Sequence, residues 1–151
     1  MISKTLLLFL STWIIENTEF KEKIDSPNLF KLSQKEMADK ACFSSDNCRV
    51  KAYYVKDSGI FYVDELEPQN NVCDRSIILH ELIHHYQKNN DRSFDLDAQT
   101  LWTLQERQAI YYQNLFLISQ KRLNDNKGPE NVLQCEGGSY LDLQYKFNDS
   151  K

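Results

Sequence analysis

The stretch that decides the fold is DRSIILHELIHHYQ, residues 74–87. Its isoleucines and leucines recur at helical spacing and are numerous enough for a largely buried helix. Asp74 stands where an N-cap belongs, because an aspartate oxygen accepts hydrogen bonds from the first free N–H groups of a helix. All three histidines of the chain lie in this segment. We therefore expect a buried helix over 75–87 that carries the chemistry of the protein.

Within this helix, residues 80–84 form an H-E-x-x-H motif, His-Glu-Leu-Ile-His. Side chains four positions apart lie on one helix face, about 5–6 Å apart at Cβ, so His80 and His84 can bind one metal ion. Glu81 is offset by one position and is suited to contact a water on that metal rather than the metal itself. The alternative is that both histidines are core residues with satisfied hydrogen bonds. His85 lies about 100° around the helix from His84, so we expect it to pack or hydrogen-bond elsewhere.

This motif resembles the signature of the zincin metallopeptidases, and the resemblance covers His80, Glu81 and His84 with their helix. It implies a zinc ion held by the two histidines and by a third ligand downstream, with Glu81 as the general base that activates water. The metzincin continuation is absent, because no histidine follows this helix. The gluzincin pattern, with a helical glutamate well downstream as the ligand, is matched by Glu106, 22 positions after His84. Ile110 stands where that pattern has an aspartate.

Glu106 is also a candidate ligand on its surroundings alone. In the helix expected over 98–123 it shares a mostly apolar stripe with Trp102, Ala109, Gln113, Phe116 and Leu117. Burying a lone carboxylate is costly, and a metal ion removes that cost by supplying positive charge. An ion pair with Arg107 is the alternative, and Asp95 and Asp97 compete for the ligand role. Gln113, further along the stripe, is placed to orient a ligand.

The segments before the motif helix predict a small β-sheet. Residues 50–55 and 60–64 are β-rich runs on either side of a glycine-containing turn, which predicts a hairpin. A short strand is expected at 29–32. The residues Ser33 to Glu36 have the S-x-x-E form of a capping box, which starts a short helix.

These elements predict a single α+β domain over residues 1–151. In it, a small twisted sheet packs on the motif helix and on the long helix that carries Glu106. The resemblance to minimal single-domain zincins adds that one strand of the hairpin is the edge strand that holds an extended substrate.

The apolar segment from Leu6 to Ile15 has two interpretations. Its large side chains recur at three- and four-residue steps, which favours a helix of the domain and a cytoplasmic protein. The segment also has about the length of a signal-peptide core, and that alternative places the protein outside the cytoplasm, secreted or periplasmic. No small-residue cleavage site follows it, so we favour a domain helix within residues 1–19. It is too short to span a bilayer.

The four cysteines lack C-x-x-C spacing, which argues against a cysteine zinc site. Their even number allows two disulfides, Cys42 with Cys48 and Cys73 with Cys135. Reduced, buried cysteines are the alternative.

The charge balance excludes one class of partner. With 18 Lys and Arg against 22 Asp and Glu, the net charge of −4 provides no basic face for nucleic acid. The expected function is that of a zinc-dependent metallopeptidase acting on a peptide or protein substrate. The alternative is a catalytically silent zincin-fold protein that binds zinc in a regulatory role, and the oligomeric state is left open.

Overall fold

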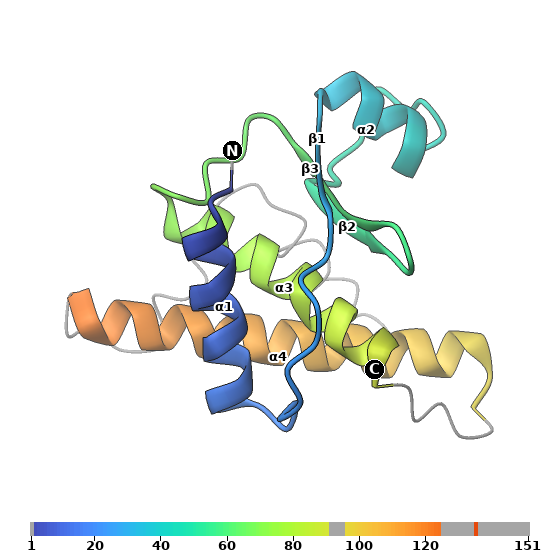
Figure 1. Ribbon diagram of the computed structural model, residues 1–151. Helices are drawn as coiled ribbons and strands as arrows, with labels where there is room; N and C mark the ends of the chain where they lie inside the picture. The colour runs from blue at the N-terminus through green and yellow to red at the C-terminus, as the bar shows by residue number, and fades with distance from the viewer. Residues whose placement is uncertain (1, 91–95, 125–134, 136–151) are drawn as a thin grey trace.

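Four helices and three strands make up the described part of the chain, residues 2–90, 96–124 and 135, in the computed structural model (Figure 1). The elements in chain order are α1 (Lys4–Asn17), β1 (Leu29–Leu32), α2 (Gln34–Ala41), β2 (Ala52–Val55), β3 (Gly59–Val63), α3 (Val72–Asn89) and α4 (Ala98–Asn124). The expected α+β fold is confirmed. The predicted hairpin, short first strand and capping-box helix are all present, and Ser33 and Glu36 exchange both hydrogen bonds of the capping box.

The sheet has the strand order β1-β3-β2, so β1 and β2 are its edges. β2 and β3 form the antiparallel hairpin, and β1 pairs with β3 in parallel. Gly59 begins β3 with a φ of 141°, and a Cβ at this position would lie 2.2 Å from the carbonyl oxygen of Asn28. Glycine is therefore required where the chain leading into β1 approaches β3.

Helix α3 is the centre of the molecule, because it contacts both α4 and the strands β2 and β3. Figure 1 shows α3 crossing the long α4, with α1 beside it and the sheet and α2 gathered at one side. The Ile and Leu side chains of α3 are buried, as the sequence predicts: Ile77, Ile78, Leu79, Leu82 and Ile83.

The start of α3 differs from the prediction by three residues. The N-cap is Asn71, whose side-chain oxygen accepts the N–H of Asp74 at 3.1 Å. Asp74, the predicted cap, lies in the first turn, and its carboxylate accepts the N–H of Glu67 at 2.9 Å. Asparagine and aspartate cap helices about equally well, so local propensity did not distinguish the two positions. The earlier start places Cys73 inside the helix.

Helix α1 packs one face against the rest of the molecule. Leu6, Leu10, Trp13 and Ile14, which recur at helical spacing in the sequence, are all buried. Trp13 meets Phe116 of α4 edge to face, with 5.4 Å between the ring centroids. Among the described residues, no helix combines the length and the apolar composition needed to cross a bilayer.

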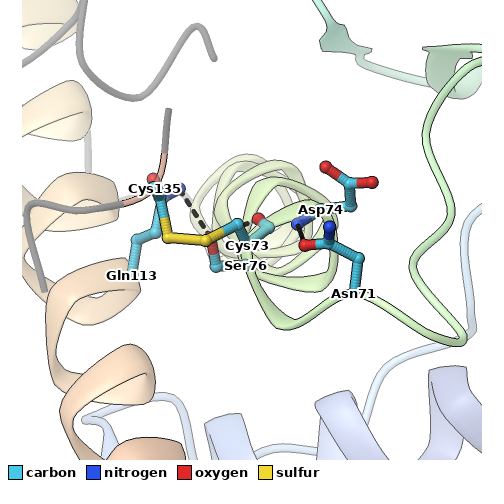
Figure 2. The surroundings of a disulfide bond; sticks show 6 residues. All are labelled: Asn71, Cys73, Asp74, Ser76, Gln113 and Cys135. Atoms are coloured by element: carbon cyan, nitrogen blue, oxygen red, sulfur yellow. Dashed lines mark hydrogen bonds between the residues drawn. A yellow bond between two sulfur atoms is a disulfide. The ribbon is translucent and has the colours of Figure 1, made fainter. Parts of the chain in front are cut away.

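Both cysteine pairs that the sequence allows are disulfides in the structure, Cys42–Cys48 and Cys73–Cys135. The first closes the loop after α2. The second joins the first turn of α3 to residue 135, as Figure 2 shows. A loop closed over a sequence separation of 62 stabilises the fold by about 4 kcal/mol in the chain-entropy description.

Candidate metal centre

His80, His84 and Glu106 converge at the interface of α3 and α4. The Nε2 atoms of His80 and His84 are 3.2 Å apart. The Glu106 carboxylate reaches both rings, with Oε1 at 2.7 Å from Nε2 of His84 and Oε2 at 3.3 Å from Nε2 of His80. One potential ligand atom from each residue lies within 4.8 Å of the others, so the group can hold a metal ion. The structure thus brings together the three residues that the sequence singles out.

The local reason for this convergence differs between the two helices. The histidines share a face of α3 because one helical turn separates them. Glu106 belongs to the mostly apolar stripe of α4, at the position where this stripe contacts the histidines of α3. The stripe is fully buried only from Ala109 onward, and its first member, Trp102, is 50% exposed. The mostly apolar stripe predicted around Glu106 is therefore present, but its first residue, Trp102, is half exposed.

Two of the three separations between ligand atoms fit a tetrahedral metal, and the third, 2.7 Å between His84 Nε2 and Glu106 Oε1, has the length of a hydrogen bond. Two ligands at about 2.0–2.1 Å from zinc, at the tetrahedral angle, are about 3.3 Å apart. The separation of the two Nε2 atoms and that between His80 Nε2 and Glu106 Oε2 are close to this value. Two histidines and one glutamate form a donor set of catalytic zinc sites.

Glu106 itself provides an independent test of the fit. Its Oε2 atom is fully buried and makes no hydrogen bond within the described residues, and its ion-pair contact is with Nε2 of His80 at 3.3 Å. A buried carboxylate oxygen without a partner is costly, and a cation bound there removes the cost. This atom faces the histidine pair, so the orphaned oxygen and the two ring nitrogens point to the same position.

The charges of the site depend on one another. Burial opposes the charged form of Glu106, yet its contacts with His80 and His84 hold the pKa of this carboxylate well below its usual range. Burial also disfavours a charged His84, but Glu106 and Glu81 together raise the pKa of His84 above its usual value. A positive charge at this position, whether a proton on His84 or a metal ion, is therefore stabilised by the surrounding carboxylates.

Glu81 lies beside this group and is 5% exposed. Its burial raises the pKa of the carboxyl, and the two histidines and the backbone N–H of Tyr54 in β2, which donates a hydrogen bond to it, only partly offset that effect. A carboxyl with a raised pKa next to a metal centre is suited to take up and release a proton.

Asp97, one of the two competing aspartates, is not part of this group. Asp97 caps α4, where its carboxylate accepts the N–H of Thr100 at 2.8 Å, and it is exposed. Asp95 lies outside the described residues. Nε2 of His85 donates a hydrogen bond to the Asp25 carbonyl at 2.7 Å, and its Nδ1 lies 3.1 Å from the Tyr54 hydroxyl. His85 therefore hydrogen-bonds away from the His80–His84 pair, as predicted.

The ring nitrogens that face away from Glu106 are also bonded. His80 Nδ1 lies 2.9 Å from Oε1 of Gln113, the residue predicted to orient a ligand. His84 Nδ1 lies 2.7 Å from Oε1 of Gln87. Gln87 was not predicted from the sequence, although a position three residues after His84 on the same helix is a neighbour of that ring.

The buried carboxyl of Glu81 predicts a pH-dependent stability for the metal-free protein. The folded state raises the pKa of Glu81, so protonation of this carboxyl stabilises the folded state. The stabilisation is complete below about pH 4.5, the ordinary pKa of the group, and is lost as the pH rises through the pKa in the folded state. Glu81→Gln is neutral at every pH. Its melting temperature should exceed that of the wild type at pH 7, by about 2–4 °C for each kcal/mol, and the difference should shrink toward pH 4.5.

Calorimetry in the presence of a chelator, at a series of pH values, measures this difference. Glu16→Gln, a substitution on the exposed face of α1, is the matched control and should show no such trend. A melting temperature for Glu81→Gln that stays below the wild-type value at pH 7 would contradict the prediction.

Comparison with known proteins gives a family match. The model of the family described as "Domain of unknown function (DUF6647)" matches residues 2–125, which include every residue of the site. No curated protein and no solved structure matches the chain.

Proposed function

We propose that this chain, which belongs to the DUF6647 family, is a zinc-dependent hydrolase and most specifically a metallopeptidase. The observation that carries the proposal is the convergence of His80, His84 and Glu106 with Glu81 buried beside them. A site that only stabilises the fold needs metal ligands but has no need of a carboxyl base next to them. The resemblance of the motif to the zincins, with Glu106 in the gluzincin position, supports the same conclusion.

His80, His84 and Glu106 are the residues that would hold the metal. A zinc ion supplies a Lewis acid there and lowers the pKa of bound water toward about 7. Glu81 acts as the general base: its carboxylate accepts a proton from the attacking water and then donates that proton to the leaving amine. Glu81 is buried, so a proton taken from the water is held away from bulk solvent between the two transfers.

The edge strand β2 is the proposed position of an extended substrate. The carbonyl of Lys51 accepts the N–H of Val63 in β3 at 2.9 Å. Since backbone groups alternate along an antiparallel pair, those of Ala52 and Tyr54 point to the outer edge. The Tyr54 N–H meets Glu81 there. A peptide added to this edge through the backbone groups of Ala52 and the carbonyl of Tyr54 would therefore lie beside the general base.

A cavity of about 480 Å³ adjoins the same strand. It is lined by Tyr54, by the hairpin turn at Asp57 to Gly59, by His85 and by the segment from Lys23 to Asn28. His80, Glu81, His84 and Glu106 are not among its lining residues, so Tyr54 is the residue that links it to the site. Its volume is within the range of ligand sites, and we assign it to a substrate side chain remote from the cleaved bond.

Peptide hydrolysis tests the proposal directly. The full-length, disulfide-bonded protein loaded with one zinc per chain is incubated with a library of short peptides, and new termini are identified by mass spectrometry. We expect cleavage that stops on addition of a chelator and returns when zinc is restored, because catalysis needs the metal. Full zinc binding without any cleavage contradicts the proposal and supports the catalytically silent alternative.

The compartment stays a prediction. Disulfides are typical of oxidising environments and rare in the cytosol. The two disulfides of this chain therefore favour an oxidising compartment, although the apolar segment forms helix α1 and packs in the domain, as the domain-helix interpretation expects. This preference does not depend on the function proposed for the site.

A further inference from the structure

Two buried glutamines contact the metal-binding histidines from the side opposite Glu106. Gln113 is 1% exposed and Gln87 6% exposed. A buried amide needs partners for two N–H groups and one oxygen, so its orientation can be worked out from the groups around it.

The orientation of Gln113 follows from Ser76. The Ser76 hydroxyl donates its hydrogen to the carbonyl of Cys73 at 2.6 Å. Toward Gln113, 3.1 Å away, the hydroxyl can therefore only accept, and the amide nitrogen of Gln113 must donate (Figure 2). This places the amide oxygen of Gln113 against His80 Nδ1, at 2.9 Å.

The orientation of Gln87 follows from α4. Its amide nitrogen lies 2.9 Å from the backbone carbonyl of Gln105 and 2.8 Å from the side-chain oxygen of Gln108. A carbonyl only accepts, so both hydrogens of this nitrogen are used. The amide oxygen is left for His84 Nδ1, at 2.7 Å.

The consequence for the two rings is the same. An amide oxygen is an acceptor, so Nδ1 of each histidine must carry a hydrogen and donate it. In a neutral imidazole the other nitrogen, Nε2, then carries the lone pair that can bind a metal. These are the two Nε2 atoms that face each other and Glu106.

We propose that Gln113, held by Ser76, and Gln87, held by the Gln105 carbonyl, are positioning residues that fix His80 and His84 in the tautomer that binds metal through Nε2. This inference rests on the proposed function only for the identity of the metal. The hydrogen bonds that run from His80 through Gln113 and Ser76 end on the Cys73 carbonyl in α3. Those that run from His84 through Gln87 end on the Gln105 carbonyl in α4. The packing of α3 against α4 therefore prepares both ligands before a metal arrives.

Zinc affinity of variants at Gln113 and Gln87 distinguishes a positioning role of the two amides from a merely structural role. Gln113→Leu and Gln87→Leu remove the acceptor, and we expect zinc to bind about 10–100-fold more weakly, measured by competition with a chromophoric chelator. Gln113→Glu and Gln87→Glu keep an oxygen acceptor for Nδ1 and should stay within about threefold of the wild type. Lys88→Met is the matched control, because it removes a hydrogen bond between the same helices, to Gln105, without touching a histidine.

Melting temperatures of the metal-free variants make the test sharper. Leucine suits a buried position and a buried glutamate charge does not, so a purely structural role predicts that the Glu variants are the more damaged. Our inference predicts that zinc affinity follows the opposite order: the Leu variants bind zinc more weakly than the Glu variants. Equal zinc binding by the Leu variants and the wild type, or equal losses in the Leu and Glu variants, would overturn it.

Nuclear magnetic resonance of the zinc-loaded wild type needs no variant. Long-range proton–nitrogen correlations identify which ring nitrogen binds metal, and the chain has only three histidines to assign. Binding through Nε2 with hydrogen on Nδ1 is the expected result for both ligands, and binding through Nδ1 contradicts the inference. Affinities that follow the predicted order without any peptide hydrolysis support this inference and contradict the proposed function.

Discussion

Glu81→Gln is expected to abolish hydrolysis while leaving zinc in place. The amide keeps the size of the side chain and can still accept the Tyr54 N–H, but it cannot take a proton from water. General acid–base catalysis commonly contributes a rate factor of about 10²–10⁴, and kcat should fall by about as much. Steady-state kinetics on the best peptide from the library, with zinc content measured on the same sample, records both quantities.

The control for this substitution is Glu16→Gln, which removes an exposed carboxylate far along α1 and should leave kcat unchanged. The expected signature of a lost general base is a lower kcat with an almost unchanged KM. If Glu81→Gln cleaves peptides at the wild-type rate, Glu81 is not the base. If it loses zinc together with activity, Glu81 acts on the metal site instead.

Removal of a metal ligand is expected to have the second large effect. Wild-type protein dialysed against a weak chelator should retain about one zinc per chain, and His80→Ala or His84→Ala should retain little. Glu106→Gln should also weaken zinc binding, because it removes the only carboxylate that contacts both rings among the described residues. Metal analysis of the dialysed proteins measures the outcome.

Two control substitutions change other histidine or aspartate residues near the motif that could serve as metal ligands. His85→Ala alters the third histidine, which hydrogen-bonds to Tyr54 and Asp25, and it should keep its zinc. Asp97→Asn changes the cap of α4 and should keep its zinc as well. The ligand assignment is wrong if Glu106→Gln holds zinc normally while Asp95→Asn or Asp97→Asn does not.

Several structural features could be predicted because they depend on neighbours in the chain. The capping box at Ser33 and the hairpin about Gly59 are local patterns with a local cause. The prediction of Asp74 as the cap of α3 was wrong for a related reason, since Asn71, three positions earlier, caps equally well and local preference does not separate the two. Cysteine pairing was left open, because spacing along the chain does not say which sulfurs meet.

The sequence by itself determined that His80 and His84 share one face, because the period of an α-helix brings residues four apart together wherever the helix lies. It also identified Glu106 as a carboxylate on an apolar stripe. Only the packing of α3 against α4 decided that Glu106 Oε1 lies 2.7 Å from His84 and that Gln113 of α4 faces His80 Nδ1. Those distances depend on the angle and offset at which two helices cross, and the side chains of the whole interface set these rather than any one segment of the chain.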